Sequence, residues 1–147
     1  IREPEEIVRR HFGESLFTGT HLPEAGTLLD FGSGAGFPGL PIQLLRHGLT
    51  VTLAESQNKK AAFLREAVRT LDLKTEVWAA RVEAMPGLRQ FDIVTLRAVD
   101  NMAAAIAAAT PRVRPGGLLA TLASRSGDLE EIAVPNAESA VLRLQRF

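Results

Sequence analysis

The sequence predicts an α/β fold with a doubly wound, mostly parallel sheet and helices on both faces. Short apolar runs typical of buried strands alternate with segments whose apolar residues recur at helical spacing. A glycine-rich turn joins the first of these runs to the helix that follows, as is common in βαβ units. The chain has 147 residues, 46% of them hydrophobic, so we expect a single domain over residues 1–147.

Composition excludes several classes of protein and leaves others open. Seventeen basic side chains offset seventeen acidic ones, so the net charge gives no indication of nucleic-acid binding. The chain has no cysteine, which excludes disulfides, thiolate metal sites and a cysteine nucleophile. No apolar run approaches the roughly 20 residues that span a bilayer, and we therefore expect a soluble, cytoplasmic monomer with no membrane contact. The chain begins at Ile1 rather than at a methionine, so we expect a further N-terminal part to be missing.

The first expected element is a helical segment at about residues 4–17. Glu5 and Glu6 lie in its first turn, where acidic side chains complement the helix dipole, and apolar residues continue at helical spacing to Leu16. The stretch that follows is rich in Gly, Thr and Pro, which predicts a loop. The next expected elements are this loop at 18–26, a strand at 27–31, a helix at 38–47 and a strand at 50–55.

The second half begins with the clearest amphipathic helix of the chain. It follows Ser56, whose hydroxyl is a suitable N-cap, and continues to about Leu71 with Ala61 and Leu64 on its apolar face. An alanine-rich stretch further on has high helix propensity. The elements expected here are a strand at 76–79, a loop or short helix at 81–90, a strand at 91–96, a helix at 101–109, a turn at 115–117, a strand at 118–123, a polar break at 124–128, and short strands at 132–134 and 140–144.

The turn after the first strand is the first candidate binding site. It contains alternate glycines between Asp30 and Phe37, and a new helix follows. Glycine permits positive φ angles and close approach of a ligand to the main chain, and the free N–H groups of a helix start favour electron-rich atoms. Asp30, Gly32, Gly34 and Phe37 are therefore candidate ligand-binding residues. A tight connection without a ligand is the alternative interpretation.

Glu55 strengthens the interpretation as a nucleoside site. It lies about 20 residues beyond the turn, at the end of the second expected strand, where a carboxylate can accept hydrogen bonds from both ribose hydroxyls. A solvated acid at a strand end is the alternative. The loop after the third strand offers Val82 to pack on an adenine ring and Glu83 beside it, unless it is an ordinary exposed loop.

Two ligands compete for such a site, a dinucleotide and S-adenosylmethionine. The dinucleotide fingerprint requires glycine or alanine where this chain has Phe37, and Asp30 just before the turn would repel a pyrophosphate. A carboxylate there instead attracts, directly or through water, the cationic methionine end of S-adenosylmethionine. Arg97, at the end of the fourth strand, can pair with the carboxylate of this donor or with a nucleic-acid phosphate; a surface ion pair is the alternative.

These residues together resemble the glucose-inhibited division protein B family, bacterial guanine-N7 methyltransferases that act on 16S ribosomal RNA. The resemblance extends to about Ala123 and implies the class I methyltransferase (Rossmann-like) form of the α/β fold. The matching stretches are Arg2–Glu5, His11-Phe12, Asp30–Pro41, Glu55-Ser56 with the Lys-rich helix after it, Arg81-Val82-Glu83 and Leu96-Arg97-Ala98.

The resemblance implies a cofactor, S-adenosylmethionine, and a partner, 16S ribosomal RNA or the small ribosomal subunit. It implies that Gly32 and Phe37 touch the cofactor, that Val82 and Glu83 border its adenine, and that Arg97 lines the cofactor or target pocket. Guanine N7 has an in-plane lone pair and no proton, so the reaction needs positioning and no catalytic base. The three histidines lack metal-ligand spacing, and we expect no metal.

Two other functions remain open. The family usually has serine where this chain has Leu96, and a Lys-Gly after the fifth strand where this chain has Ser124-Arg125-Ser126. These departures leave room for a non-catalytic RNA-binding or ribosome-assembly module on the same scaffold. An NAD-dependent oxidoreductase is less favoured because its fingerprint is wrong at Phe37.

Overall fold

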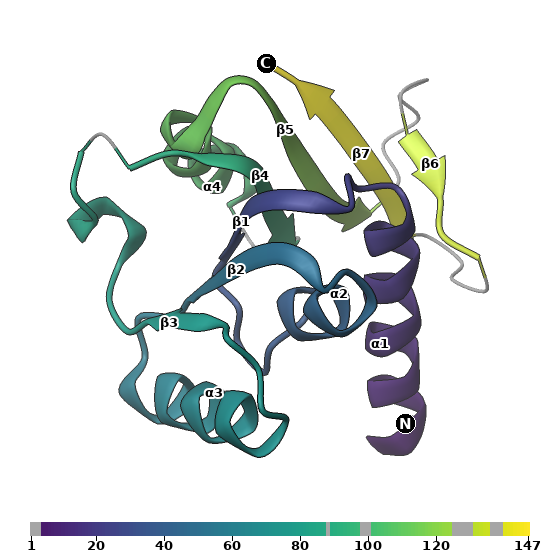
Figure 1. Ribbon diagram of the computed structural model, residues 1–147. Coiled ribbons are helices and arrows are strands. Elements are labelled where there is room, and N and C mark those ends of the chain that lie inside the picture. The colour runs from purple at the N-terminus through teal and green to yellow at the C-terminus, as the bar shows by residue number, and fades with distance from the viewer. Residues whose placement is uncertain (1–3, 88, 98–100, 125–130, 136–139) are drawn as a thin grey trace.

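The computed structural model describes residues 4–87, 89–97, 101–124, 131–135 and 140–147. Within these residues, seven strands form one sheet in the order β3-β2-β1-β4-β5-β7-β6 (Figure 1). The strands are β1 (Ala25–Phe31), β2 (Gly48–Ala54), β3 (Glu76–Trp78), β4 (Phe91–Arg97), β5 (Val113–Ser124), β6 (Glu131–Ala133) and β7 (Ala140–Arg146). The helices are α1 (Pro4–Thr20), α2 (Gly39–Leu45), α3 (Asn58–Thr70) and α4 (Met102–Ala109), with short 3-10 turns η1 (Val82–Ala84) and η2 (Thr110–Arg112).

The sheet is mostly parallel and doubly wound, as predicted. β1 to β5 pair in parallel, whereas β7 pairs antiparallel with both β5 and β6. The strand order reverses between β1 and β4, because β2 and β3 extend the sheet from one side of β1 and β4 and β5 extend it from the other. In doubly wound sheets, ligands bind beyond the carboxyl ends of the strands near this reversal.

Alternation of side chains along the strands builds two cores, one on each face. Leu28 packs in the core that includes Leu40 of α2 and Leu64 of α3. Its neighbour Leu29 faces the opposite core, which includes Ala109 of α4. The prediction of helices on both faces is therefore confirmed, with α2 and α3 on one face and α4 on the other (Figure 1).

The first half of the chain corrects the predicted boundaries. α1 extends to Thr20 and β1 begins at Ala25, so most of the predicted loop at 18–26 is wrong. The hydroxyl of Thr18 donates to the carbonyl of Glu14 at 2.9 Å, within the helix that a Thr- and Gly-rich composition did not predict. α2 spans only Gly39–Leu45, within the longer helix expected at 38–47.

Three further differences follow from local backbone chemistry. Ser56 is not an N-cap, because α3 starts at Asn58 after Gln57 and has no side-chain cap. The expected turn at 115–117 lies inside β5, where the register against β4 shifts between Phe91 and Ile93 and so absorbs the extra residues. Asn101 caps α4, since its side-chain oxygen accepts from the amide of Ala104 at 3.0 Å. The predicted polar break at 124–128 falls, beyond Ser124, outside the described residues.

Candidate functional site

A cavity of about 140 Å³ lies at the carboxyl ends of β1, β2 and β3. Two backbone hydrogen bonds hold these strand ends together: Ser33 N donates to Ala54 O at 2.9 Å, and Glu55 N donates to Trp78 O at 3.0 Å. The structure therefore brings together three of the predicted site residues: Gly32 of the first turn, and Val82 and Glu83 of the loop after β3. The cavity is lined by Phe31, Gly32, Ala54, Ser56, Ala80, Arg81, Val82 and Glu83.

The glycine turn leaves room for a ligand beside its backbone. Gly32 and Gly34 have φ angles of +69° and +57°, a region that favours glycine, and a Cβ at either position would meet no atom within 4 Å. Side chains at these positions would therefore project into free space at the site. This geometry fits a ligand that packs against the main chain.

Glu55 joins the turn to the start of α3. Its Oε1 accepts from the amide of Gly34 and its Oε2 from the amide of Gln57, both at 2.9 Å, and the residue is only 7% exposed. Each carboxylate oxygen can accept a second hydrogen bond. The carboxylate is thus fixed at the end of β2 with acceptor capacity left for hydroxyl groups, which is the arrangement predicted for a ribose.

Asp30 lies beneath the turn, not on its ligand side. The residue is fully buried, and its carboxylate accepts from Ser33 Oγ at 2.7 Å, Thr95 Oγ1 at 2.8 Å and the amide of Gly39 at 3.0 Å. Contact with the methyl donor was predicted for Asp30 either directly or through water, and the direct form is corrected to a positioning role: the side chain ties the turn to α2 and β4. Because Asp30 follows Leu28 at period two, it faces the core under α2.

Burial raises the pKa of Asp30 from 3.8 to about 6, although its hydrogen bonds oppose that shift. A carboxyl whose pKa is higher in the folded state stabilises the fold most below pH 3.8, and this contribution is lost as the pH rises through 6. The difference corresponds to about 3 kcal/mol.

We predict the effect of Asp30→Asn on the pH dependence of stability. The amide oxygen can accept from Ser33 and Gly39 while the amide group donates to Thr95, so the variant should fold. On acidification from pH 7.5 to 4, wild-type protein should gain about 2 kcal/mol of unfolding free energy relative to the variant. Urea unfolding at several pH values measures this; a constant difference between the two proteins would contradict it.

Phe37 and Arg97 lie toward α1 and do not line the 140 Å³ cavity. The ring of Phe37 is 5.8 Å from that of His11 in α1. Arg97 Nη1 donates to Nδ1 of His11, and its Nη2 lies 3.5 Å from Oε1 of Glu14. The bond to Arg97 requires a neutral His11, and burial together with the charge of Arg97 lowers the pKa of that imidazole. The sequence did not predict this role for α1.

Arg112 is a second residue that the sequence did not single out. It is 7% exposed and lies beside the loop that supplies Val82 and Glu83 to the cavity. Its guanidinium donates to four backbone carbonyls of this region, with donor–acceptor distances from 2.8 to 3.3 Å. The acceptors are Val82, Met85, Pro86 and Arg89. These partners are backbone atoms 23 to 30 positions away, for which no sequence pattern exists.

Solved structures similar to this chain include a named methyltransferase. TYW2 from P. horikoshii, in complex with MeSAdo, superposes with a TM-score of 0.79 at 14% identity, over 99% of this chain and 64% of that one. N-methyltransferase NodS from Bradyrhizobium japonicum WM9 gives a TM-score of 0.67 at 17% identity, over 99% and 98%. At such identities these similarities show the fold alone.

Curated relatives share much more of the sequence. Ribosomal RNA small subunit methyltransferase G of Xanthomonas campestris pv. campestris (strain B100) is 39% identical over 153 residues, which cover 94% of this chain and 72% of that protein. The protein of the same name from Stenotrophomonas maltophilia (strain K279a) is 42% identical over 120 residues, or 81% of this chain and 56% of that protein. The GidB profile, described as rRNA small subunit methyltransferase G, matches residues 1–146. The chain therefore belongs to the GidB family of rRNA small subunit methyltransferases, the family that its motifs resemble.

Proposed function

We propose that this protein transfers a methyl group from S-adenosylmethionine to N7 of a guanine in 16S ribosomal RNA. The observation that carries the proposal is the cavity at the carboxyl ends of β1–β3, where Gly32, Val82 and Glu83 meet next to Glu55. Membership of the GidB family supports the same reaction. The chain spans 72% and 56% of the two relatives described, so activity on the ribosomal substrate is a proposal for this chain.

The residues around the cavity fit an adenosine derivative. Gly32 and Gly34 leave the main chain open, Glu55 offers its carboxylate to the ribose hydroxyls, and Val82, only 4% exposed, forms an apolar wall for the adenine. Glu83 lies at the exposed rim. When bound, S-adenosylmethionine supplies an electrophilic methyl group on a sulfonium.

Positioning is the contribution that this chain makes to the chemistry. Guanine N7 attacks with its own lone pair and loses no proton, so no side chain needs to act as a base. Asp30 fixes the turn from beneath, and Phe37 and Arg97 connect the site to α1. We assign Asp30 and Phe37 to holding the cofactor and Arg97 to holding the target, so that the two lie in line and water is excluded.

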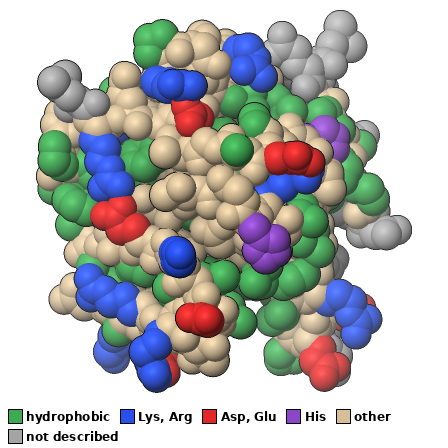
Figure 2. All heavy atoms as spheres, in the orientation of Figure 1, with side chains coloured by type: hydrophobic (Ala, Val, Ile, Leu, Met, Phe, Trp, Pro, Cys, Tyr) green, Lys and Arg blue, Asp and Glu red, His purple; other side chains and the backbone are tan. Residues whose placement is uncertain are grey.

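The partner proposed for this activity is 16S ribosomal RNA or the small subunit, and the protein acts as a monomer in the cytoplasm. The face shown in Figure 2 mixes Lys and Arg with Asp and Glu side chains. RNA recognition therefore requires local sites, not a uniformly positive surface. Within the described residues, no helix has the length and hydropathy to cross a bilayer.

The test combines cofactor binding with methyl transfer. Calorimetry should show binding of S-adenosylhomocysteine that NAD does not compete away. Labelled S-adenosylmethionine should then methylate small subunits that lack the modification, and mass spectrometry should locate the methyl group on guanine N7. Subunits that already carry the modification are the control and should take up no label.

Each failure has a distinct meaning. Absence of S-adenosylhomocysteine binding to folded protein would reject the methyl donor, and displacement by NAD would favour an oxidoreductase. Cofactor and RNA binding without methyl transfer would favour the non-catalytic RNA-binding module.

A further inference from the structure

Three buried side-chain nitrogens in the described part of the chain have no hydrogen-bond partner. They are Nε of Arg10 and both Nε and Nη2 of Arg97. The two arginines lie close enough for their charges to interact, although one is in α1 and the other ends β4. Buried guanidinium donors are normally paired, so three unpaired ones at one place indicate an acceptor that the protein itself does not supply.

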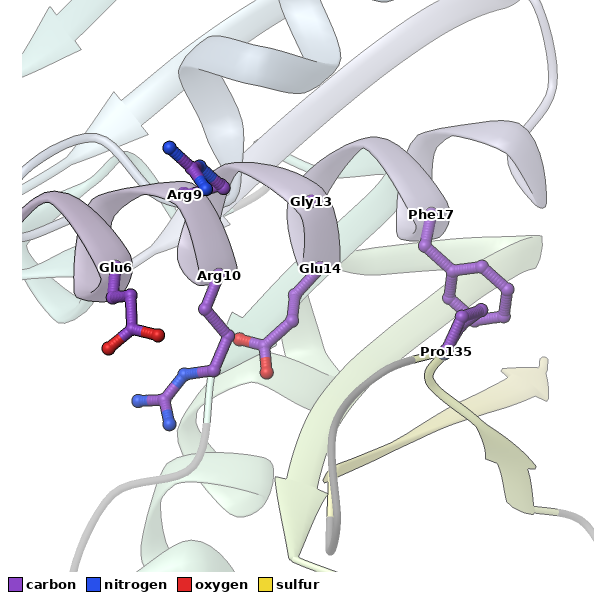
Figure 3. Close-up of a pocket in the computed structure, with 7 residues that line it drawn as sticks. All are labelled: Glu6, Arg9, Arg10, Gly13, Glu14, Phe17 and Pro135. Carbon is purple, nitrogen blue, oxygen red and sulfur yellow. The ribbon is translucent and has the colours of Figure 1, made fainter. Parts of the chain in front are cut away.

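A pocket of about 480 Å³ lies beside these donors, along α1 (Figure 3). Arg10 and Glu14 project from the same side of the helix, and Phe17 reaches toward Pro135, which follows β6, at one end. Arg9 also lines the pocket, but its side chain projects from the opposite side of the helix. Arg97 is not itself a lining residue, but its Nη2 lies 3.5 Å from Oε1 of Glu14, which lines the pocket.

Residues of α1 fix the direction in which Arg97 presents its free donors. Neutral His11 accepts from Nη1, and Glu14 lies 3.5 Å from Nη2 without making a hydrogen bond to it. Nε and Nη2 are therefore buried donors without a hydrogen bond, and Nη2 has only the ion pair with Glu14. A guanidinium held through one nitrogen is well placed to bind an oxyanion through the other two.

We propose that Arg10 and Arg97 together bind a phosphate of the RNA strand that carries the target guanine. This inference rests on the proposed function and adds a substrate site to it. Arg9 and Arg10 are balanced by Glu6 and Glu14 among the lining residues, so the preference for an anion rests on the guanidinium donors of Arg10 and Arg97 that have no hydrogen-bond partner. Arginine also suits phosphate better than lysine does, because its planar fork matches two oxygens.

An RNA phosphate fits this position better than the carboxylate of the methyl donor. The pocket along α1 shares no lining residue with the cavity assigned to the cofactor. Its walls come from α1 and from Pro135 after β6, and the cofactor cavity is lined by the turn after β1 and the loops after β2 and β3. An oxyanion in this pocket therefore belongs to a molecule that extends beyond the cofactor.

The test measures methylation kinetics of Arg10→Met with unmodified small subunits as the RNA substrate. The KM for RNA should rise about tenfold, since a charge-assisted contact is lost, while kcat and the affinity for S-adenosylhomocysteine stay unchanged. In a plot of log KM for RNA against log salt concentration, the slope should be smaller than in wild type by about 0.7 to 0.9, the contribution of one phosphate contact. Thermal unfolding verifies that the variant is folded.

Arg9→Met is the matched control, because it removes the same charge from the adjacent position of the same helix, while its side chain projects from the opposite side of that helix. Its KM for RNA should stay within about twofold of wild type. An equal rise in both variants would overturn the proposal, because general attraction would then explain it, and so would an unchanged KM in Arg10→Met.

Arg97→Met separates the two sources of oxyanion. The proposal expects weaker RNA binding with unchanged affinity for S-adenosylhomocysteine. The opposite result has three parts: the variant binds S-adenosylhomocysteine more weakly, binds 5′-methylthioadenosine, which lacks the carboxylate, as wild type does, and binds RNA as wild type does. This result would assign Arg97 to the cofactor and overturn the proposal. If wild-type protein does not methylate RNA at all, the result rejects the proposed function as a whole, and with it this phosphate site.

Discussion

Replacing Gly32 with valine is expected to lower the affinity for S-adenosylhomocysteine at least about 100-fold, equivalent to about 2.7 kcal/mol. Gly32 lines the cavity, and its Cβ would point into space that holds no protein atom within 4 Å. A branched side chain there occupies the volume that the cofactor needs. The positive φ angle of +69° adds strain of about 1–2 kcal/mol to the fold, which calorimetry of the folded variant separates from the loss of binding.

Gly116→Val is the matched control for this experiment. Gly116 also has a positive φ angle, +83°, and open space around its Cβ, but it lies near the amino-terminal end of β5, whereas the cofactor cavity lies at the carboxyl ends of β1–β3. The control should lose similar stability in urea unfolding and bind S-adenosylhomocysteine like wild type. Equal affinity of the Gly32→Val variant and wild type would remove the turn from the site.

The sequence predicted the architecture around this turn because local chemistry determines it. Alternate glycines after a buried strand indicate a tight turn of the backbone, and Glu55 directly follows the next strand because the apolar run stops there. The two residues meet in the structure through the bond between Glu55 and the amide of Gly34. The positions of the two strands along the chain were sufficient to predict that Glu55 and the glycine turn lie close together, since the carboxyl ends of parallel strands lie at the same end of the sheet.

The remaining parts of the site depend on contacts between distant segments. Arg97 lies 86 positions from His11, and no local pattern predicts that α1 packs against the end of β4. The composition of residues 18–20 predicted a loop, yet the hydroxyls of Thr18 and Thr20 bond back to carbonyls of α1. Asp30 was assigned to the ligand from its place in the motif, although alternation from Leu28 turns its side chain toward the core under α2.

Arg112→Met is expected to loosen the loop that borders the adenine. The substitution keeps most of the aliphatic volume of Arg112 but leaves four carbonyl acceptors without their donor, two in buried and two in partly buried positions. Unsatisfied acceptors of this kind lower the unfolding free energy by about 2–4 kcal/mol. The carbonyl of Val82 is one of the four acceptors, and its side chain is a wall of the cavity. The variant should therefore also bind S-adenosylhomocysteine more weakly than wild type.

Hydrogen exchange localises the effect of Arg112→Met and distinguishes it from a general loss of stability. The amides of Ala84 and Met85 donate to Arg81 and Val82 within the loop, and they should exchange faster in the variant. The amide of Leu40, which donates to Gly36 at 2.7 Å on the far side of the sheet, should keep its protection relative to global unfolding. Unchanged protection of Ala84 together with unchanged cofactor affinity would show that Arg112 supports only the fold. Faster exchange at Ala84 with weaker binding would identify Arg112 as a positioning residue for the adenine loop.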